Sequence, residues 1–254
     1  MRVTVLGCNG GITGNLRTTC YRVDDDLLID CGTGAGDLSL QQAIAIDAVF
    51  LTHAHLDHCG MLPLLADAAG NFRDASLTVY ALPETIAAIR RNLLNGEIWP
   101  DYAALPSPER PYIRFQPIAP GETVELNGRK ITALPTRHAV PGVAYQLDSG
   151  AASLVYSGDT TWCEEFWLSL DRIANLKYLL IENTFLNANA ANAARSGHMT
   201  ASLLARGMRL LHRPVELFIV HMEAGHEDET FHEIQRAIAE FQPALLQRGQ
   251  ELII

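Results

Sequence analysis

The stretch His53-Ala54-His55-Leu56-Asp57-His58 constrains this chain more than any other, because it directly follows the apolar run Ala48-Val49-Phe50-Leu51. Burying so many polar side chains without partners would be costly. Imidazole nitrogens and carboxylate oxygens are, however, the ligands that zinc and its first-row neighbours take. In an extended segment, residues 53 and 55 project to the same side. The stretch therefore predicts a strand that turns into a helix starting near Cys59 and presents two pairs of ligands to two metal ions. A solvated histidine-rich loop is the alternative.

Four later apolar runs predict strands that also end in a polar, chemically active residue. They are Lys130–Leu134 with His138, Ser153–Tyr156 with Asp159, Tyr178–Ile181 with Glu182, and Leu217–Val220 with His221. His198 lies between the last two, at the start of a predicted helix that runs to about Leu211. In open α/β sheets, sites assemble outside the carboxyl ends of strands. Alone, each residue would be explained by a core hydrogen bond or a turn, but their recurrence favours a metal site.

The remaining segments predict supporting structure. Arg2–Leu6 is predicted to be a strand, and Gly7–Gly14 a glycine-rich loop whose spacing is wrong for dinucleotide binding. Asn127-Gly128 is typical of a hairpin turn. Asn95–Pro111 is a long irregular connection, which is either a lid or a structural loop. The three histidines outside the strand-end pattern are expected on the surface: His212, His226 and His232.

Length and charge limit the classes of function. A chain of 254 residues is consistent with a single domain covering 1–254. No apolar run is long enough for a membrane helix, and no leader is evident, so we expect a cytoplasmic protein. The five cysteines show no paired spacing and are expected to be free thiols, although Cys59 adjoins the histidine stretch and is a candidate soft ligand. A net charge of −10 argues against nucleic-acid binding, whereas an anionic substrate could be bound through metal ions.

The motif His53-x-His55-x-Asp57-His58, followed by His138, Gly158-Asp159 and His221, resembles the metallo-β-lactamase superfamily over essentially the whole chain. This resemblance implies an α/β fold, namely an αββα four-layer sandwich with pseudo-symmetric halves and a two-metal site at one edge. It implies that the first metal ion is bound by His53, His55 and His138, the second by Asp57, His58 and His221, with Asp159 bridging. Two divalent ions are the expected cofactors: zinc first, with manganese or iron as alternatives.

Two further positions are similar to the phosphodiesterase branch of this superfamily. Glu182 in Ile181-Glu182-Asn183-Thr184 and His198 in Gly197-His198-Met199-Thr200 resemble its Glu–His pair, which lactamases, lactonases and glyoxalase II enzymes lack. The segments around His55–Leu62 and Leu6–Gly11 resemble class II cyclic-nucleotide phosphodiesterases and their bacterial relatives. The chain departs from that pattern at His221-Met222-Glu223, where an apolar residue followed by Lys or Ser-Pro is typical.

The resemblance implies hydrolysis of a small phosphodiester, in the closest match a 3′,5′-cyclic nucleotide, by attack of a metal-bridging hydroxide. His198 is expected to protonate the leaving group, Glu182 to orient His198, and Asp57 to position the nucleophile as well as bind metal. The alternative is a ribonuclease Z-like tRNA 3′-end endonuclease, although no basic Gly/Pro-rich arm is evident. A non-catalytic binding protein on the same scaffold is the third hypothesis. The apolar end Leu252-Ile253-Ile254 suggests either a homodimer contact or a place in the chain's own core.

Overall fold

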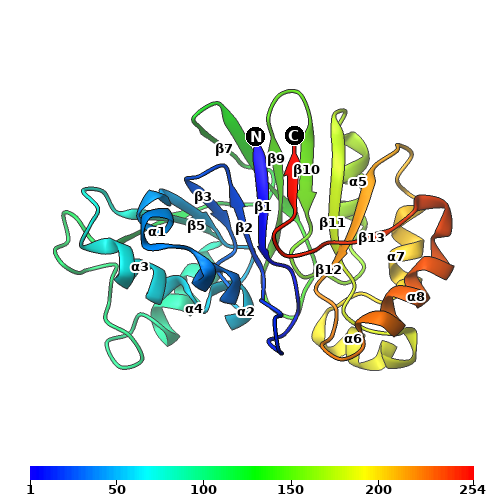
Figure 1. Ribbon diagram of the computed structural model, residues 1–254, viewed down its shortest axis with the longest axis horizontal. Helices are drawn as coiled ribbons and strands as arrows, with labels where there is room; N and C mark the ends of the chain where they lie inside the picture. Colours follow the sequence, from blue (N-terminus) through cyan, green and yellow to red (C-terminus); the bar gives the residue numbers. More distant parts are fainter.

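Two mixed β-sheets of seven strands each form the centre of the computed structural model, which describes residues 1–254 (Figure 1). The first sheet has the order β14 (Glu251–Ile253), β1 (Arg2–Gly7), β2 (Cys20–Val23), β3 (Leu27–Ile29), β4 (Ala48–Phe50), β5 (Leu77–Ala81) and β6 (Ile113–Pro117). The second has the order β13 (Ala244–Leu245), β12 (Glu216–Val220), β11 (Leu176–Glu182), β10 (Ser153–Tyr156), β9 (Val143–Asp148), β8 (Arg129–Pro135) and β7 (Thr123–Leu126). In both sheets, a strand from the C-terminal end of the chain (β14 or β13) lies at one edge, and the other strands follow in order along the sheet.

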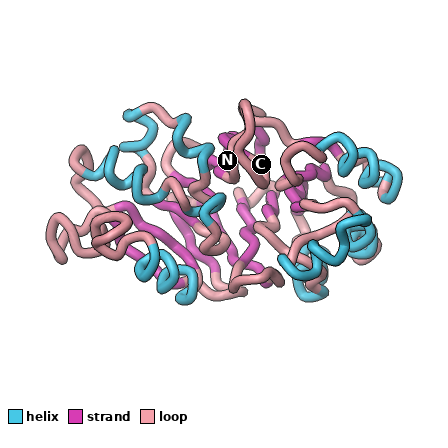
Figure 2. The backbone as a smooth tube through the Cα atoms, turned by 90° about the horizontal axis from the view of Figure 1, so that it is seen from below, coloured by secondary structure: helices cyan, strands magenta, loops and turns pink.

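Helices cover the outer face of each sheet, so the structure is the four-layer αββα sandwich that the sequence predicts (Figures 1 and 2). Those beside the first sheet are α1 (Leu40–Ala45), α2 (Leu56–Cys59), α3 (Leu62–Gly70) and α4 (Pro83–Asn92). Those beside the second are α5 (Glu164–Arg172), α6 (Ala190–Ser196), α7 (Ala201–Met208) and α8 (Glu227–Ala237). Short 3₁₀ turns lie at Thr33–Asp37, Asn187–Asn189 and Ala239–Phe241. No helix is long and apolar enough to span a bilayer.

Strand direction brings the chemically active residues to one edge of the sandwich. Strands β3 to β6 are mutually parallel, and so are β10 to β13. Strand β8 runs in the same direction as β10, because both are antiparallel to β9. The carboxyl ends of these strands meet at the edge that carries α2, away from the chain termini (Figure 1). The strands β4 and β10 are buried on both faces, which explains why they read as unbroken apolar runs.

Three apolar clusters hold the layers together. The largest contains 25 buried residues and fills the space between the sheets, with Phe50, Tyr145 and Tyr156 among its largest side chains. The other two lie between each sheet and its helices. Leu252 and Ile254 belong to the central cluster, and β14 pairs with β1. The apolar C-terminus therefore packs in the chain's own core, as one of the two sequence hypotheses proposed.

The structure corrects two predicted helix boundaries and resolves the long connection. Helix α2 begins at Leu56, with His55 as its N-cap residue, so Asp57 and His58 lie inside the helix rather than before it. The helix after His198 ends at Met208 rather than near Leu211. In the 95–111 connection, Tyr102 is only 7% exposed and belongs to the core beside the first sheet. Tyr102 therefore anchors that connection to the core, while most of its other residues are exposed.

Arg129 joins the two halves at the end of the sandwich where the acidic turn after β2 meets the β7–β8 hairpin. Its Nη1 and Nη2 donate to the two carboxylate oxygens of Asp26 at 2.6 Å each, and Nη1 also donates to Asp24 at 3.0 Å. Arg129 is 8% exposed. In the hairpin, Asn127 and Gly128 both have positive φ, as the predicted tight turn requires.

Replacing Arg129 with Met should destabilise the protein at neutral pH, because both aspartates lose their partner while partly desolvated. We expect the free energy of unfolding to fall by about 2 kcal/mol at pH 7, measured by urea denaturation. Arg129 hydrogen bonds lower the pKa of Asp26. The stabilisation is therefore present above about pH 4 and is lost as the pH falls through the lower folded-state pKa. The control is Arg2→Met, because the ion pair of Arg2 with Asp25 is exposed. This substitution should lower the free energy of unfolding by less than about 1 kcal/mol. Equal effects of both substitutions would contradict a special role for Arg129.

Candidate active site

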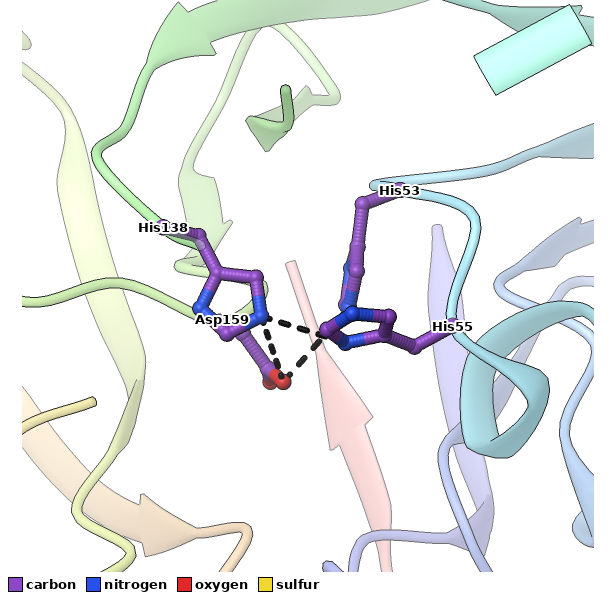
Figure 3. A group of neighbouring side chains, drawn as sticks. All are labelled: His53, His55, His138 and Asp159. Atoms are coloured by element: carbon purple, nitrogen blue, oxygen red, sulfur yellow. Dashed lines mark hydrogen bonds and ion pairs between the residues drawn. The ribbon is translucent and has the colours of Figure 1, made fainter. Parts of the chain in front are cut away.

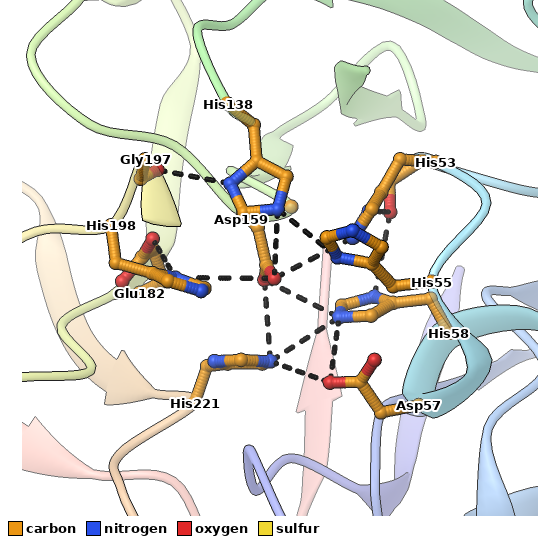
Figure 4. Close-up of polar contacts among 12 residues, drawn as sticks. His53, His55, Asp57, His58, His138, Asp159, Glu182, Gly197, His198 and His221 are labelled. Atoms are coloured by element: carbon orange, nitrogen blue, oxygen red, sulfur yellow. Dashed lines mark hydrogen bonds and ion pairs between the residues drawn. The ribbon is translucent and has the colours of Figure 1, made fainter. Parts of the chain in front are cut away.

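Residues from both halves converge between the carboxyl ends of the strands. The first half supplies His53 and His55 from the turn after β4, and Asp57 and His58 from α2. The second half supplies His138 after β8, Asp159 after β10, Glu182 at the end of β11, His198 before α7 and His221 after β12. All nine residues singled out from the sequence therefore lie in one place (Figure 4).

The first group of candidate ligands consists of His53, His55, His138 and Asp159 (Figure 3). His138 Nε2 lies 3.2 Å from His55 Nδ1. Asp159 Oδ2 lies 3.6 Å from His53 Nε2 and 3.8 Å from His138 Nε2. Four ligands about 2.0–2.1 Å from a tetrahedral ion would be separated by about 3.4 Å. These atoms are therefore spaced as ligands of one ion.

The second group consists of Asp57, His58, His221 and, again, Asp159. His58 Nε2 and His221 Nε2 are 3.3 Å apart, and Asp57 Oδ2 lies 3.1 Å from His221 Nε2 (Figure 4). Asp159 Oδ1 lies 3.3 Å from His58 Nε2 and 3.4 Å from His221 Nε2. Asp159 thus presents one oxygen to each group, which is the position of a bridging carboxylate.

The buried polar groups of the cluster would be stabilised by a nearby positive charge. His53 Nε2 and Asp159 Oδ1 are buried without a hydrogen-bond partner, which a bound cation would provide. Burial lowers the pKa of His53 well below its usual value, so its imidazole is neutral and able to bind metal. Burial alone would also lower the pKa of His58, but Asp159 and Asp30 raise it well above the usual range. These carboxylates thus favour a positive charge where a divalent ion would lie, and the residues fit a metal centre.

Asp30 and Thr52 orient the ligands of the first half, and the sequence analysis missed both. Asp30 Oδ2 accepts from His58 Nδ1 at 2.7 Å, and Thr52 Oγ1 lies 3.0 Å from His53 Nδ1. Thr52 also donates to Asp30 through its backbone N–H at 2.7 Å and its hydroxyl at 2.9 Å. A proton fixed on Nδ1 leaves the Nε2 lone pair free for a metal ion. Asp30 directly follows β3, so the strand-end pattern could have identified it.

Glu182 and His198 form a hydrogen-bonded pair beside Asp159. His198 Nδ1 lies 2.9 Å from Glu182 Oε1 and 4.0 Å from Asp159 Oδ2. Glu182 is fully buried and also accepts from the backbone N–H groups of Thr160, Thr184 and Met199. Burial alone would lower the pKa of His198, but the Glu182 carboxylate raises it to about 9. Cations bound at Asp159 would lower that pKa by repulsion.

The backbone near His221 is shaped by the glycine-rich loop and by a left-handed residue. His221 itself has a φ of 60°, a conformation that is uncommon for a residue with a side chain. A Cβ on Gly10 would lie 3.0 Å from His221 Nδ1, so the absence of a side chain lets the loop approach this ring.

Other sequence candidates lie away from this chemistry. His212, His226 and His232 are exposed, as predicted. All five cysteines are free thiols, as predicted, and all are buried. The Cys59 thiol donates to the Ala54 carbonyl oxygen at 3.4 Å and belongs to neither ligand group.

Comparisons with known proteins agree with this geometry. A family model described as a beta-lactamase superfamily domain matches residues 26–222. A probable 3′,5′-cyclic-nucleotide phosphodiesterase of Yersinia pestis is 27% identical over 251 residues, covering 82% of this chain and 71% of the relative. A ribonuclease Z of Bradyrhizobium diazoefficiens is 26% identical over 258 residues, covering 80% and 82%. The solved structure of unliganded yeast PDE1 superposes with a TM-score of 0.83 at 17% identity, covering 100% of this chain and 99% of that one.

The chain belongs to the metallo-β-lactamase superfamily. It is a metal-dependent hydrolase of the αββα fold, as the sequence resemblance implies. The two relatives are almost equally distant in sequence, so similarity alone does not choose between a cyclic nucleotide and tRNA as substrate.

Asp30→Asn should weaken metal binding although Asp30 belongs to neither ligand group. Both of its oxygens face donors, so an amide NH₂ must oppose either the Thr52 N–H or the His58 imidazole. We expect about a 10–100-fold loss of zinc affinity, measured by competition with a chelating dye. Asp25→Asn, in an exposed turn, is the control and should bind zinc normally. Unchanged affinity in a folded Asp30→Asn protein would show that Asp30 does not support His58.

Proposed function

We propose that the chain, acting as one domain over residues 1–254, hydrolyses a small phosphodiester, with a 3′,5′-cyclic nucleotide as the favoured substrate. The observation that carries this proposal is the Glu182–His198 pair beside Asp159, since a phosphodiester with an alkoxide leaving group requires a proton donor. The proposed phosphodiesterase chemistry is also that of both relatives reported above. Free cysteines are consistent with the reducing cytoplasm as its location.

The proposed metal ligands follow the two groups in the structure. His53, His55 and His138 would hold one ion, Asp57, His58 and His221 the other, and Asp159 would bridge them. Two divalent ions, with zinc favoured, would supply a water-derived nucleophile at neutral pH and neutralise charge on the phosphoryl oxygens. Asp57 Oδ2 faces His58 and His221, which leaves its second oxygen available to orient the attacking water.

His198 is the proposed general acid and Glu182 its orienting partner. Because Nδ1 is held by Glu182, the proton to be donated is on Nε2. Glu182 keeps the imidazole in one orientation and stabilises its protonated form, as a carboxylate does in other acid–base pairs. His198 retains partial exposure, with 12% of its side chain accessible, so a substrate oxygen can reach it.

A small substrate is favoured over tRNA by the charge of the chain and by its connections. The net charge is −10, whereas tRNA binding requires many Lys and Arg contacts with phosphates. The long connection between α4 and β6 is folded onto the body: Ile113 N–H donates to the Tyr102 carbonyl and Tyr112 N–H to that of Leu105. It therefore offers no extended arm for tRNA. Tyr102 of this loop is buried and so is not available to stack on a base, whereas Trp99 is half-buried.

His198→Ala should retain its metal ions and lose most of its turnover. We expect kcat on cyclic AMP to fall by about 10²–10⁴-fold, because the alkoxide leaving group needs a proton. The loss on bis(nitrophenyl) phosphate should be much smaller, since nitrophenolate leaves without one. Metal content and steady-state kinetics on both substrates are the measurements. Equal losses on both would remove His198 from the role of general acid.

A substrate panel on the zinc-loaded protein separates the functional alternatives. We expect cleavage of cyclic AMP or cyclic GMP, with weak dependence on salt, and no processing of precursor tRNA. Cleavage of precursor tRNA that weakens steeply with salt would instead favour a ribonuclease Z-like enzyme. Full metal loading without cleavage of any diester would favour a non-catalytic binding protein.

A further inference from the structure

The Thr184 hydroxyl lies between the second ligand group and the Glu182–His198 pair. Its Oγ1 is 3.1 Å from His221 Nδ1, 2.9 Å from Glu182 Oε2 and 3.1 Å from His198 Nδ1. The same oxygen lies 2.9 Å from the His221 carbonyl oxygen. Thr184 is only 7% exposed, so water does not replace these contacts readily. Thr184 is neither a proposed metal ligand nor the proposed acid.

The hydrogens in this network have one consistent arrangement. His221 turns Nε2 toward Asp57 and Asp159, so a His221 that binds metal through Nε2 carries its hydrogen on Nδ1. That hydrogen points at Thr184 Oγ1, which must accept it. The single hydroxyl hydrogen of Thr184 is then donated to Glu182 Oε2, since a carboxylate accepts more strongly than a carbonyl. His198 Nδ1 donates to the other oxygen of Glu182.

We propose that Thr184 is a positioning residue that links the ligand His221 to the Glu182–His198 pair through one continuous chain of hydrogen bonds. The inference rests on the proposed function, because it concerns the acid of that reaction. A cation on His221 would strengthen the Nδ1–H as a donor to Thr184, and this in turn would strengthen the hydroxyl as a donor to Glu182. Occupancy of the second metal site thereby helps to fix the carboxylate that orients His198.

The first half of the molecule contains the same arrangement, which argues that the Thr184 contacts are part of the site. There, Thr52 Oγ1 contacts the Asp30 carboxylate at 2.9 Å and His53 Nδ1 at 3.0 Å, while Asp30 holds His58 at 2.7 Å. Each half therefore uses a threonine and a carboxylate to orient two imidazoles. In the first half both imidazoles are proposed metal ligands. In the second half, one is a proposed ligand and the other is the proposed acid.

Thr184→Val, which keeps the shape and removes the hydroxyl, tests the link. It leaves His221 Nδ1–H and Glu182 Oε2 without their shared partner. We expect about tenfold weaker binding of the second zinc ion, measured by chelator competition. At saturating zinc, we expect kcat on cyclic AMP to fall by about tenfold or more with little change in KM, and to change by less than about threefold on bis(nitrophenyl) phosphate. Thr184→Ser retains the hydroxyl and should restore both properties.

Thr230→Val is the matched control, because Thr230 is fully buried and its hydroxyl has no partner. It should bind zinc and turn over substrate like the unmodified protein. If Thr184→Ser loses as much zinc affinity and kcat as Thr184→Val, the packing of the methyl group is what matters, and the proposed link through the hydroxyl is wrong. If Thr184→Val stays within about twofold of the unmodified protein in zinc affinity and kcat, the link is also wrong.

A double-mutant cycle in zinc affinity distinguishes failure of this inference from failure of the proposed function. Glu182→Gln should weaken binding of the second zinc ion. The effect should be smaller when Thr184 is already Val, because both changes break the same chain of hydrogen bonds. Additive effects would overturn the link between Thr184 and Glu182. The cycle needs no substrate, so it decides the inference even if the unmodified protein cleaves no diester, a result that would overturn the proposed function alone.

Discussion

The structure depends on the burial of one carboxylate, Asp159, among imidazoles that arrive from both halves of the chain. Asp159 is 3% exposed and lies within 4.0 Å of five histidines. A buried carboxylate with an unpartnered oxygen is stable only if the surroundings provide positive charge. Bound cations would meet that need, and the spacing of the imidazole nitrogens suits them. The same requirement explains why these side chains must be held rigidly, since a cation is bound well only where its ligand atoms keep this spacing.

Rigidity comes from hydrogen bonds outside the ligand groups. Asp30 and Thr52 fix His58 and His53, the Gly197 carbonyl fixes His138 through Nδ1 at 2.9 Å, and Thr184 fixes His221. Two of the residues involved, Asp30 and His221, have positive φ at the ends of β3 and β12. Such conformations are unfavourable for residues with side chains and persist where the surrounding structure determines them. The strained positions thus occur where strands end and the site begins.

The repeated sheet order gives a physical reason for one site rather than two. Each half brings a threonine, a carboxylate and a pair of imidazoles to the same edge. Because the strand ends of both sheets meet there, the two sets share Asp159. The second half differs by holding His198 through Nδ1 against the fully buried Glu182, which leaves its Nε2 free for proton transfer. Asp159, Glu182 and His198 also lie close enough to form a third group of possible ligands, but Nδ1 of His198 already faces Glu182. The proposed division of labour between metal binding and acid catalysis follows from that difference.

The sequence by itself determined the strands that lead into the site, the order of their polar ends and the nine residues of the cluster, but it did not predict β9, β13 or β14. Apolar runs followed by His, Asp or Glu are local signals, and parallel strands necessarily gather such residues at one edge. The sequence did not determine the start of α2. An N-cap at His55 depends on the direction that the backbone takes in the turn after β4, which the local sequence does not specify. It also left the burial of Tyr102 and the fate of the C-terminal strand undecided. The strand-end pattern could have identified Asp30, but the roles of Thr52, Thr184 and Arg129 were decided by tertiary structure. Each of these three side chains has a partner far away in the chain: Asp30 for Thr52, His221 for Thr184 and Asp26 for Arg129. Hydrogen bonds of that kind depend on the packing of two sheets, which no local pattern encodes.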